Sequence, residues 1–216
     1  MLAEASSTLG TSRAAGSGNC AECHVPPGFT DDAFHNTGAA QDAYDAAHGQ
    51  GSFVRLIVPS LRERNDDFDR WLPPTSQHPK AAGAMRSAMV EPNEQPDLGL
   101  WNVYGNPDLP ASQTAIERKL NPTGRLIADE VLALTLGRFK TPTLRDLARS
   151  APYLHNGSQR SIEDVIRFYQ RASDPASALR NPPNEYAGMK LAESDVAPLA
   201  AFLRALHETT LSSPPE

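Results

Sequence analysis

The residues best suited to chemistry lie in one pentapeptide, Cys20-Ala21-Glu22-Cys23-His24, which contains both cysteines of the chain. Two thiols three positions apart, with a histidine directly after the second, form the C-x-x-C-H signature of covalent c-type haem attachment. In such a site the thiols bond to the porphyrin vinyl groups and the histidine ligates the iron. The pentapeptide therefore predicts one covalently bound haem c, held by Cys20, Cys23 and His24.

Two other interpretations of this pentapeptide are weaker. A zinc site needs further ligands at short spacing, but there is no other cysteine and the remaining histidines are scattered along the sequence. They are His35, His48, His78, His155 and His207. A thioredoxin-like redox C-x-x-C follows an apolar strand, whereas residues 11–19 (TSRAAGSGN) are polar and rich in glycine. Haem attachment is thus the chemistry that the residues indicate.

Composition excludes several classes of protein. The 20 Lys and Arg against 26 Asp and Glu give a formal net charge of −6, which argues against binding nucleic acid by neutralising phosphates. The sequence is 39% hydrophobic and 21% charged, as expected for a folded soluble protein. No stretch approaches the roughly 18 to 20 apolar residues of a membrane helix, so we expect no membrane span. The 19 prolines and 14 glycines predict long ordered loops.

Helices must position the pentapeptide, because no run of alternating β-branched residues indicates a sheet. Ser161 and Asp164 form a variant of the capping box at the start of one helix. Its apolar stripe is Ile162, Val165, Ile166 and Tyr169. A last helix is expected from about Ser194, with Pro198 tolerated in its first turn. Residues 42–48 and 111–120 are further candidates, while 131–136 is too short to assign. The predicted fold class is all-α, a c-type cytochrome-like haem domain.

Three segments resemble a known family. They are the pentapeptide with FTDDAFHNTG (29–38), DLGLWNV (97–103) and GRFKTPTLRDLARSAPYLHNGSQRSIEDVIRFY (137–169). Their order and spacing resemble the C-terminal haem domain of the bacterial di-haem cytochrome c peroxidase and MauG family. The resemblance runs from about Cys20 to Leu206, although residues 49–94 do not match firmly. Members of that family carry two C-x-x-C-H motifs, and this sequence has one. The resemblance therefore implies the electron-transfer haem, without the haem that reacts with peroxide.

The sixth iron ligand decides the chemistry of such a haem. In the resembling family it lies on the helix after the P-Y-x-H-x-G segment, as Met in the peroxidases and Tyr in MauG, and the matching position here is Tyr169. The residues themselves leave a core tyrosine bonded to a carbonyl as an alternative. Met189, just before the last helix, is a second candidate, followed by Met85 and Met89. A phenolate would favour ferric iron, whereas a thioether would raise the potential.

Several other residues have both a functional and a structural interpretation. His35 and His155 match family positions and either orient the haem or make structural hydrogen bonds. Arg138, Lys140 and Arg145 suit haem propionates or a solvated basic loop. Trp71 and Trp101 suit electron transfer, but core packing explains them better. The calcium that the peroxidases hold between their haem domains is not expected, because the other half of that site is missing.

We expect a flexible or truncated segment over 1–19, a haem domain over 20–208 and a disordered tail over 209–216. The first 19 residues show no signal peptide, while haem attachment to C-x-x-C-H normally takes place outside the cytoplasm. An export signal or an upstream segment is thus expected to be missing, and the protein to be periplasmic or otherwise exported. The predicted partner is a second haem domain or a redox partner protein.

Two functions remain open from the sequence. One is the electron-transfer haem domain of a peroxidase or MauG-like oxidase that works with a second haem module. The other is a free-standing mono-haem cytochrome that carries electrons. An enzyme that acted alone at this haem would need an open coordination position, which Tyr169 would fill.

Overall fold

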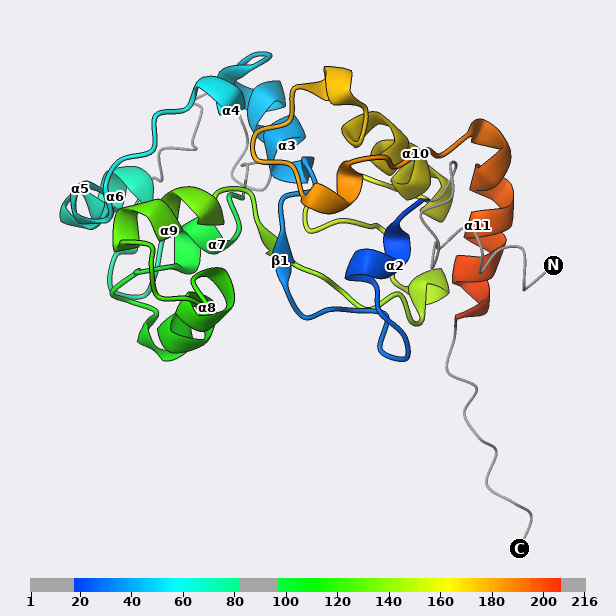
Figure 1. The fold of residues 1–216 in the computed structure, drawn as a ribbon. Helices are drawn as coiled ribbons and strands as arrows, with labels where there is room; N and C mark the ends of the chain where they lie inside the picture. The colour runs from blue at the N-terminus through cyan, green and yellow to red at the C-terminus, as the bar shows by residue number, and fades with distance from the viewer. Residues whose placement is uncertain (1–17, 82–96, 207–216) are drawn as a thin grey trace, which may run out of the picture. The chain divides into compact units, whose positions relative to one another are not determined.

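The structure, a computed structural model, describes residues 18–81 and 97–206. Within these ranges the chain is mostly α-helical, as predicted, with one two-stranded sheet (Figure 1). The chain divides into two compact units. The first combines residues up to Ala33 with Thr141–Ser177 and the chain from Asn184 onward, and the second combines Phe34–Lys140 with Ala178–Pro183. The more specific cytochrome c-like fold stays a prediction.

Some expectations fall on other parts of the chain. The segments expected to be flexible over 1–19 and disordered over 209–216 lie outside the described residues, apart from residues 18 and 19. The haem domain proposed over 20–208 remains a prediction. No helix in the described ranges is long and apolar enough to cross a membrane.

The first unit is built from short helical segments and two longer helices. In chain order they are α2 (Cys20–Cys23), η3 (Leu147–Arg149), α10 (Ile162–Ala172), η4 (Pro175–Ser177), η5 (Asn184–Tyr186) and α11 (Glu193–Ala205). Helix α10 packs against α11 (Figure 1). Their shared core is Ile162, Ile166, Val196, Leu199, Ala200 and Leu203. Cys20 of α2 packs partly buried against this core, so the cysteine helix is anchored to the α10–α11 pair.

The capping box predicted for α10 is confirmed. The Asp164 backbone N–H donates to the Ser161 hydroxyl at 3.1 Å, and the Ser161 N–H donates to the Asp164 carboxylate at 3.1 Å. Ile162 and Ile166 of the expected stripe are buried, while Val165 and Tyr169 are partly buried. Phe168, which the stripe omitted, is also buried. The helix therefore buries a wider face than one stripe of i, i+3, i+4 residues predicts.

Apolar burial stabilises the α10–α11 pair more than its ion pairs do. Arg204 meets Glu163 at 2.6 Å and Arg167 meets Glu193 at 2.6 Å, but all four side chains are at least a quarter exposed. Exposed pairs typically contribute about 0–1 kcal/mol, whereas each fully buried aliphatic side chain contributes about 1.5–3 kcal/mol. The apolar core thus dominates.

The place of Pro198 within α11 differs from the prediction. The helix begins at Glu193, so Pro198 is its sixth residue and lies in the second turn. Because proline has no N–H, the carbonyl of Ser194 lacks its regular helical donor.

The second unit carries the remaining elements. They are β1 (Phe34–His35), α3 (Ala39–His48), α4 (Ser52–Arg55), α5 (Leu61–Asp66), α6 (Phe68–Trp71), α7 (Leu100–Val103), η2 (Pro110–Ser112), α8 (Gln113–Leu120), α9 (Ala128–Thr135) and β2 (Phe139–Lys140). Strands β1 and β2 pair antiparallel, with Phe34 opposite Lys140. Two-residue strands are too short to show an alternating pattern, which is why no strand was expected from the sequence.

A buried arginine organises the middle of the second unit. Arg64 of α5 is fully buried and donates to the carbonyls of Trp101 at 2.5 Å and Tyr104 at 2.6 Å. These carbonyls lie at the C-terminal end of α7, where helical acceptors lack partners. Burial lowers the pKa of the guanidinium to about 10, so it stays protonated at neutral pH. The positive charge also lies 5.2 Å from the centre of the Trp101 ring.

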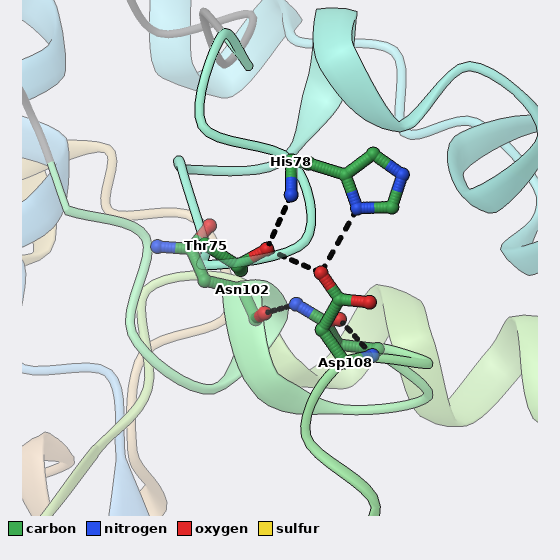
Figure 2. Close-up of polar contacts among 5 residues, drawn as sticks. Thr75, His78, Asn102 and Asp108 are labelled. Carbon is green, nitrogen blue, oxygen red and sulfur yellow. Dashed lines mark hydrogen bonds and ion pairs between the residues drawn. The ribbon is translucent and has the colours of Figure 1, made fainter.

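The Asp108 carboxylate connects two loops of the second unit through hydrogen bonds. Figure 2 shows the Asp108 carboxylate accepting from the Thr75 hydroxyl and meeting the His78 ring, whose Nδ1 lies 2.9 Å away. The His78 backbone N–H donates to the Thr75 hydroxyl at 3.1 Å. The ring of His78 stacks on Phe68 at 3.9 Å. The Asp108 side chain is 5% exposed, so its charge depends on these partners rather than on water.

Asp108→Asn tests this contact through pH. The bonds from Thr75 and His78 lower the pKa of Asp108 from its ordinary 3.8, so the carboxylate stabilises the fold above that value and loses its contribution as the pH falls through the lowered pKa. We expect the variant to unfold at lower urea concentration than the parent at pH 7. The difference should narrow below about pH 4. Urea midpoints of both proteins from pH 7 to pH 3 provide the measurement, and a difference that stays constant over this range contradicts the assignment.

Candidate functional site

The cysteine helix α2 places its side chains within a single turn. Asn19 precedes it in the left-handed conformation, with φ of 49°, and the His24 N–H donates to the Cys20 carbonyl at 2.8 Å at its end. Cys20 and Cys23 are free thiols and are partly buried. Since they lie three residues apart on one turn, both sulfurs leave the helix in similar directions. This spacing suits attachment to two neighbouring groups on one planar ligand.

Histidine 24 is oriented by the chain that follows it. Its Nδ1 lies 3.0 Å from the Phe29 carbonyl. Ligating histidines commonly hold one ring nitrogen in this way, which fixes the tautomer and the ring orientation. Ligation of a metal would therefore use Nε2.

The electrostatic environment of the thiols disfavours redox-dithiol chemistry. Burial raises the pKa of Cys20 to about 11. Burial and the nearby negative charges of Glu185 and Asp31 raise the pKa of Cys23 to about 12. A thioredoxin-like pair works through a thiolate with a lowered pKa, and these thiols are protonated at neutral pH.

Tyr169 lies on the partly buried face of α10, close to both thiols. Burial raises the pKa of its phenol, and the neighbouring Cys20 and Cys23 raise it further. None of the residues that the structure describes forms a hydrogen bond with the Tyr169 hydroxyl. Among the described residues, the Tyr169 oxygen is not one of the fully buried side-chain atoms that lack a partner, so water or a ligand can reach it. Tyr169 therefore offers an accessible oxygen donor close to the two cysteines.

These features fit a covalently bound haem c. The cysteines are free thiols that could form thioether bonds, His24 has an oriented ring, and the Tyr169 oxygen has no hydrogen-bond partner among the described residues. All four residues belong to the first unit. Within the described residues, the Tyr169 hydroxyl forms no hydrogen bond to a carbonyl, and its ligand role stays a prediction.

The other residues predicted for the haem site are divided between the two units. Arg145 is in the first unit, where its guanidinium donates to the Pro27 carbonyl at 2.7 Å, and His155 is exposed. His35, Arg138 and Lys140 belong to the second unit. Arg138 donates to the Phe34 carbonyl at 3.0 Å, which is a structural role.

The methionines were the other candidates for the sixth ligand, and the two tryptophans were candidates for electron transfer. Met189 is partly buried, and its backbone N–H donates to the Tyr186 carbonyl at 3.1 Å, while Met85 and Met89 lie outside the described residues. Trp101 is 2% exposed and belongs to the core of the second unit, with Trp71 packed against that core. Core packing therefore accounts for both tryptophans.

Sequence reasoning missed two residues of this site. Asn19 donates its side-chain amide to the carbonyls of Glu185 at 3.1 Å and Ala187 at 3.4 Å. Tyr186 is 8% exposed and meets the Tyr169 ring edge-on. Asn directly before a short helix is a recognisable signal, because Asn is favoured both as a cap and in the left-handed conformation. Tyr186 lies in an irregular segment without periodicity, so no local pattern marked it.

A C-x-x-C-H turn is typical of c-type haem attachment sites. Sequence comparison gives named relatives. The methylamine utilization protein MauG of Methylophilus methylotrophus is 38% identical over 156 residues, which are 72% of this chain and 44% of that protein. The cytochrome-c peroxidase IdrP2 of Denitromonas iodatirespirans is 26% identical over 191 residues, which are 88% of this chain and 36% of that protein.

A third relative matches a shorter region. The cytochrome-c peroxidase IdrP1 of Pseudomonas sp. (strain SCT) is 38% identical over 74 residues, which are 33% of this chain and 18% of that protein. The chain spans less than half the length of these relatives. No protein-family model matches the sequence, and no solved structure matches it. The similarities support a distant relationship with the di-haem cytochrome c peroxidase and MauG family.

Proposed function

We propose that this chain is an electron-transfer haem domain that serves peroxide-dependent oxidation together with a second haem module. It carries one covalent haem c, with thioether bonds from Cys20 and Cys23 and with His24 and Tyr169 as axial ligands. The observation that carries the proposal is the Tyr169 hydroxyl, which lies near both thiols and has no hydrogen-bond partner among the described residues. The relatives named as MauG and as cytochrome-c peroxidases support the oxidative context.

Each residue has a distinct role in this proposal. When bound, the haem supplies an iron that cycles between the ferric and ferrous states and so carries one electron. Cys20 and Cys23 fix the porphyrin to α2, and the Phe29 carbonyl orients the His24 ring. Tyr169 donates an anionic oxygen, which stabilises the ferric state. The low potential suits a domain that rests oxidised and passes electrons to a partner.

Covalent haem attachment and ligation of the iron by two residues also bear on the redox partner and on the cellular compartment of the protein. If His24 and Tyr169 both hold the iron, the domain would exchange electrons without binding peroxide, and a second haem domain or another redox protein would supply the peroxide-reacting centre. Haem attachment to C-x-x-C-H implies an exported, periplasmic protein. A free-standing electron carrier is the alternative that the experiments below distinguish.

The first test concerns covalent attachment. After denaturation, the haem absorbance should remain with the polypeptide during extraction with acidified solvent, because thioether bonds survive this treatment. Cys20→Ala combined with Cys23→Ala should release the haem into the solvent. Release from the parent protein, or retention by the double variant, contradicts the assignment.

The second test concerns the sixth ligand. Tyr169→Phe removes the oxygen donor but keeps most of the ring, so the ferric iron should become five-coordinate or water-ligated. Its potential should rise by on the order of 100 mV, since axial ligands and surroundings tune haem potentials over about 0.8 V. Optical spectra and redox titration provide the measurement, with Met189→Leu as the matched control. A parent-like Tyr169→Phe together with a changed Met189→Leu shows that methionine is the ligand.

The third test concerns peroxide. Peroxide must reach the iron, and a group that moves protons must help to break its O–O bond. With His24 and Tyr169 in both axial positions, the purified chain should turn over hydrogen peroxide poorly and gain activity only when a second haem module is supplied. Saturable turnover by the chain alone, with a kcat of about 1–1000 per second, contradicts the electron-transfer role. Electron exchange without any gain from a second haem module supports the free-standing carrier.

A further inference from the structure

The segment around Tyr186 is attached to the cysteine helix. The Asn19 amide donates to the carbonyls of Glu185 and Ala187, which flank Tyr186 on both sides. Within the segment, the Ala187 N–H donates to the Asn184 carbonyl at 3.0 Å and the Met189 N–H donates to the Tyr186 carbonyl at 3.1 Å. These bonds fix the backbone of Tyr186 relative to α2.

The side chain of Tyr186 reaches the other side of the site. Its ring lies 6.1 Å from the ring of Tyr169, at an interplanar angle of 81°. This edge-to-face arrangement is a favourable one for aromatic pairs. Tyr186 is 8% exposed, so the contact is buried. One residue thus links the helix that carries the cysteines to the proposed sixth ligand on α10.

Hydrogen bonds hold α10 around Tyr169, but the Tyr169 side chain is held by packing. The Ser173 hydroxyl donates to the Tyr169 backbone carbonyl at 2.7 Å, and the side-chain amide of Gln170 donates to the Leu191 carbonyl at 3.1 Å. The Tyr169 hydroxyl has no such bond within the described residues. Its ring orientation is therefore set by neighbouring rings, of which Tyr186 is the one attached to α2.

We propose that Tyr186 is a positioning residue, whose ring, held to the cysteine helix through Asn19, keeps Tyr169 directed at the haem iron. The inference rests on the proposed His24 and Tyr169 ligation. It predicts that the aromatic ring of Tyr186 matters and that its hydroxyl does not. The inference also predicts that the side-chain amide of Asn19, which holds the backbone on both sides of Tyr186, contributes to ligation by Tyr169.

The experiment compares variants of the haem-loaded full chain. Tyr186→Phe keeps the ring, Tyr186→Leu removes it, and Asn19→Ala removes both amide bonds. Ile116→Ala is the control for lost packing, because Ile116 is buried in the core of the second unit and that unit contributes no residue to the proposed site. The readouts are the ratio of high-spin to low-spin ferric haem, from optical and electron paramagnetic resonance spectra, and the midpoint potential.

Tyr186→Phe should match the parent. In Tyr186→Leu the high-spin to low-spin ratio should rise by between about two- and tenfold, the range expected for the loss of one edge-to-face contact, and the potential should rise with it. Asn19→Ala should raise the high-spin to low-spin ratio and the midpoint potential as well. Ile116→Ala should lower the unfolding temperature without changing the ratio. If Tyr186→Leu does not fold, Asn19→Ala provides the same test.

Other outcomes separate this inference from the function on which it rests. If Tyr169→Phe changes the spectrum while Tyr186→Leu and Asn19→Ala match the parent, the positioning role is wrong and the ligation stands. If Tyr186→Phe loses the ligand and Tyr169→Phe does not, Tyr186 is itself the ligand, and both proposals are wrong. If Ile116→Ala shifts the ratio as much as Tyr186→Leu, a general loss of packing explains the effect and the inference is overturned.

Discussion

The Tyr169 phenol has no hydrogen-bond partner among the described residues and lies near two protonated thiols, and the proposed function depends on this one oxygen. It is not among the fully buried side-chain atoms of the described residues that lack a partner, so a ligand can reach it. A ferric iron held by His24 would bind such an oxygen, because an anionic oxygen is a good ligand for it. The same arrangement would make the site a poor place for peroxide to bind. The accessible phenol therefore connects the fold to both the proposed redox role and the expected lack of independent peroxidase activity.

The rest of the first unit can be understood as the support of that oxygen. Helix α10 carries Tyr169 and is held against α11 by an apolar core, with exposed ion pairs adding little. Cys20 packs against the same core, which places the cysteine helix and the tyrosine helix on one support. Asn19 and Tyr186 add a second connection between the two helices. Attachment of the haem and orientation of its sixth ligand thus use shared packing rather than separate elements.

The sequence predicted the parts of this arrangement that have local signals. The C-x-x-C-H spacing indicated the attachment residues, the capping box at Ser161 located the start of α10, and the family resemblance singled out Tyr169. The start of α11 was located to within one residue, but Pro198 lies in the second turn of the helix rather than in the first. Phe168 was missed because α10 buries more than one stripe.

Other features depend on contacts between distant residues, which a single sequence does not show. Arg64 lies in the polar stretch LRERND and would be expected on the surface, yet it is buried because the carbonyls at the end of α7 accept its hydrogen bonds. The two strands are two residues long and form only because the chain returns to pair Phe34 with Lys140. The segment that carries Tyr186 is held by the Asn19 side chain, which lies more than 160 residues earlier in the chain.

Resonance Raman spectroscopy of the ferric protein tests the central claim most directly. Excitation in a phenolate-to-iron charge-transfer band enhances the vibrations of a coordinated tyrosine, and these vibrations shift when the protein is made with ring-deuterated tyrosine. We expect enhanced tyrosinate bands that shift on deuteration in the parent and that are lost in Tyr169→Phe. A ferric spectrum without any deuterium-sensitive bands would contradict tyrosine ligation, and with it the role proposed for Tyr169 beside the cysteines.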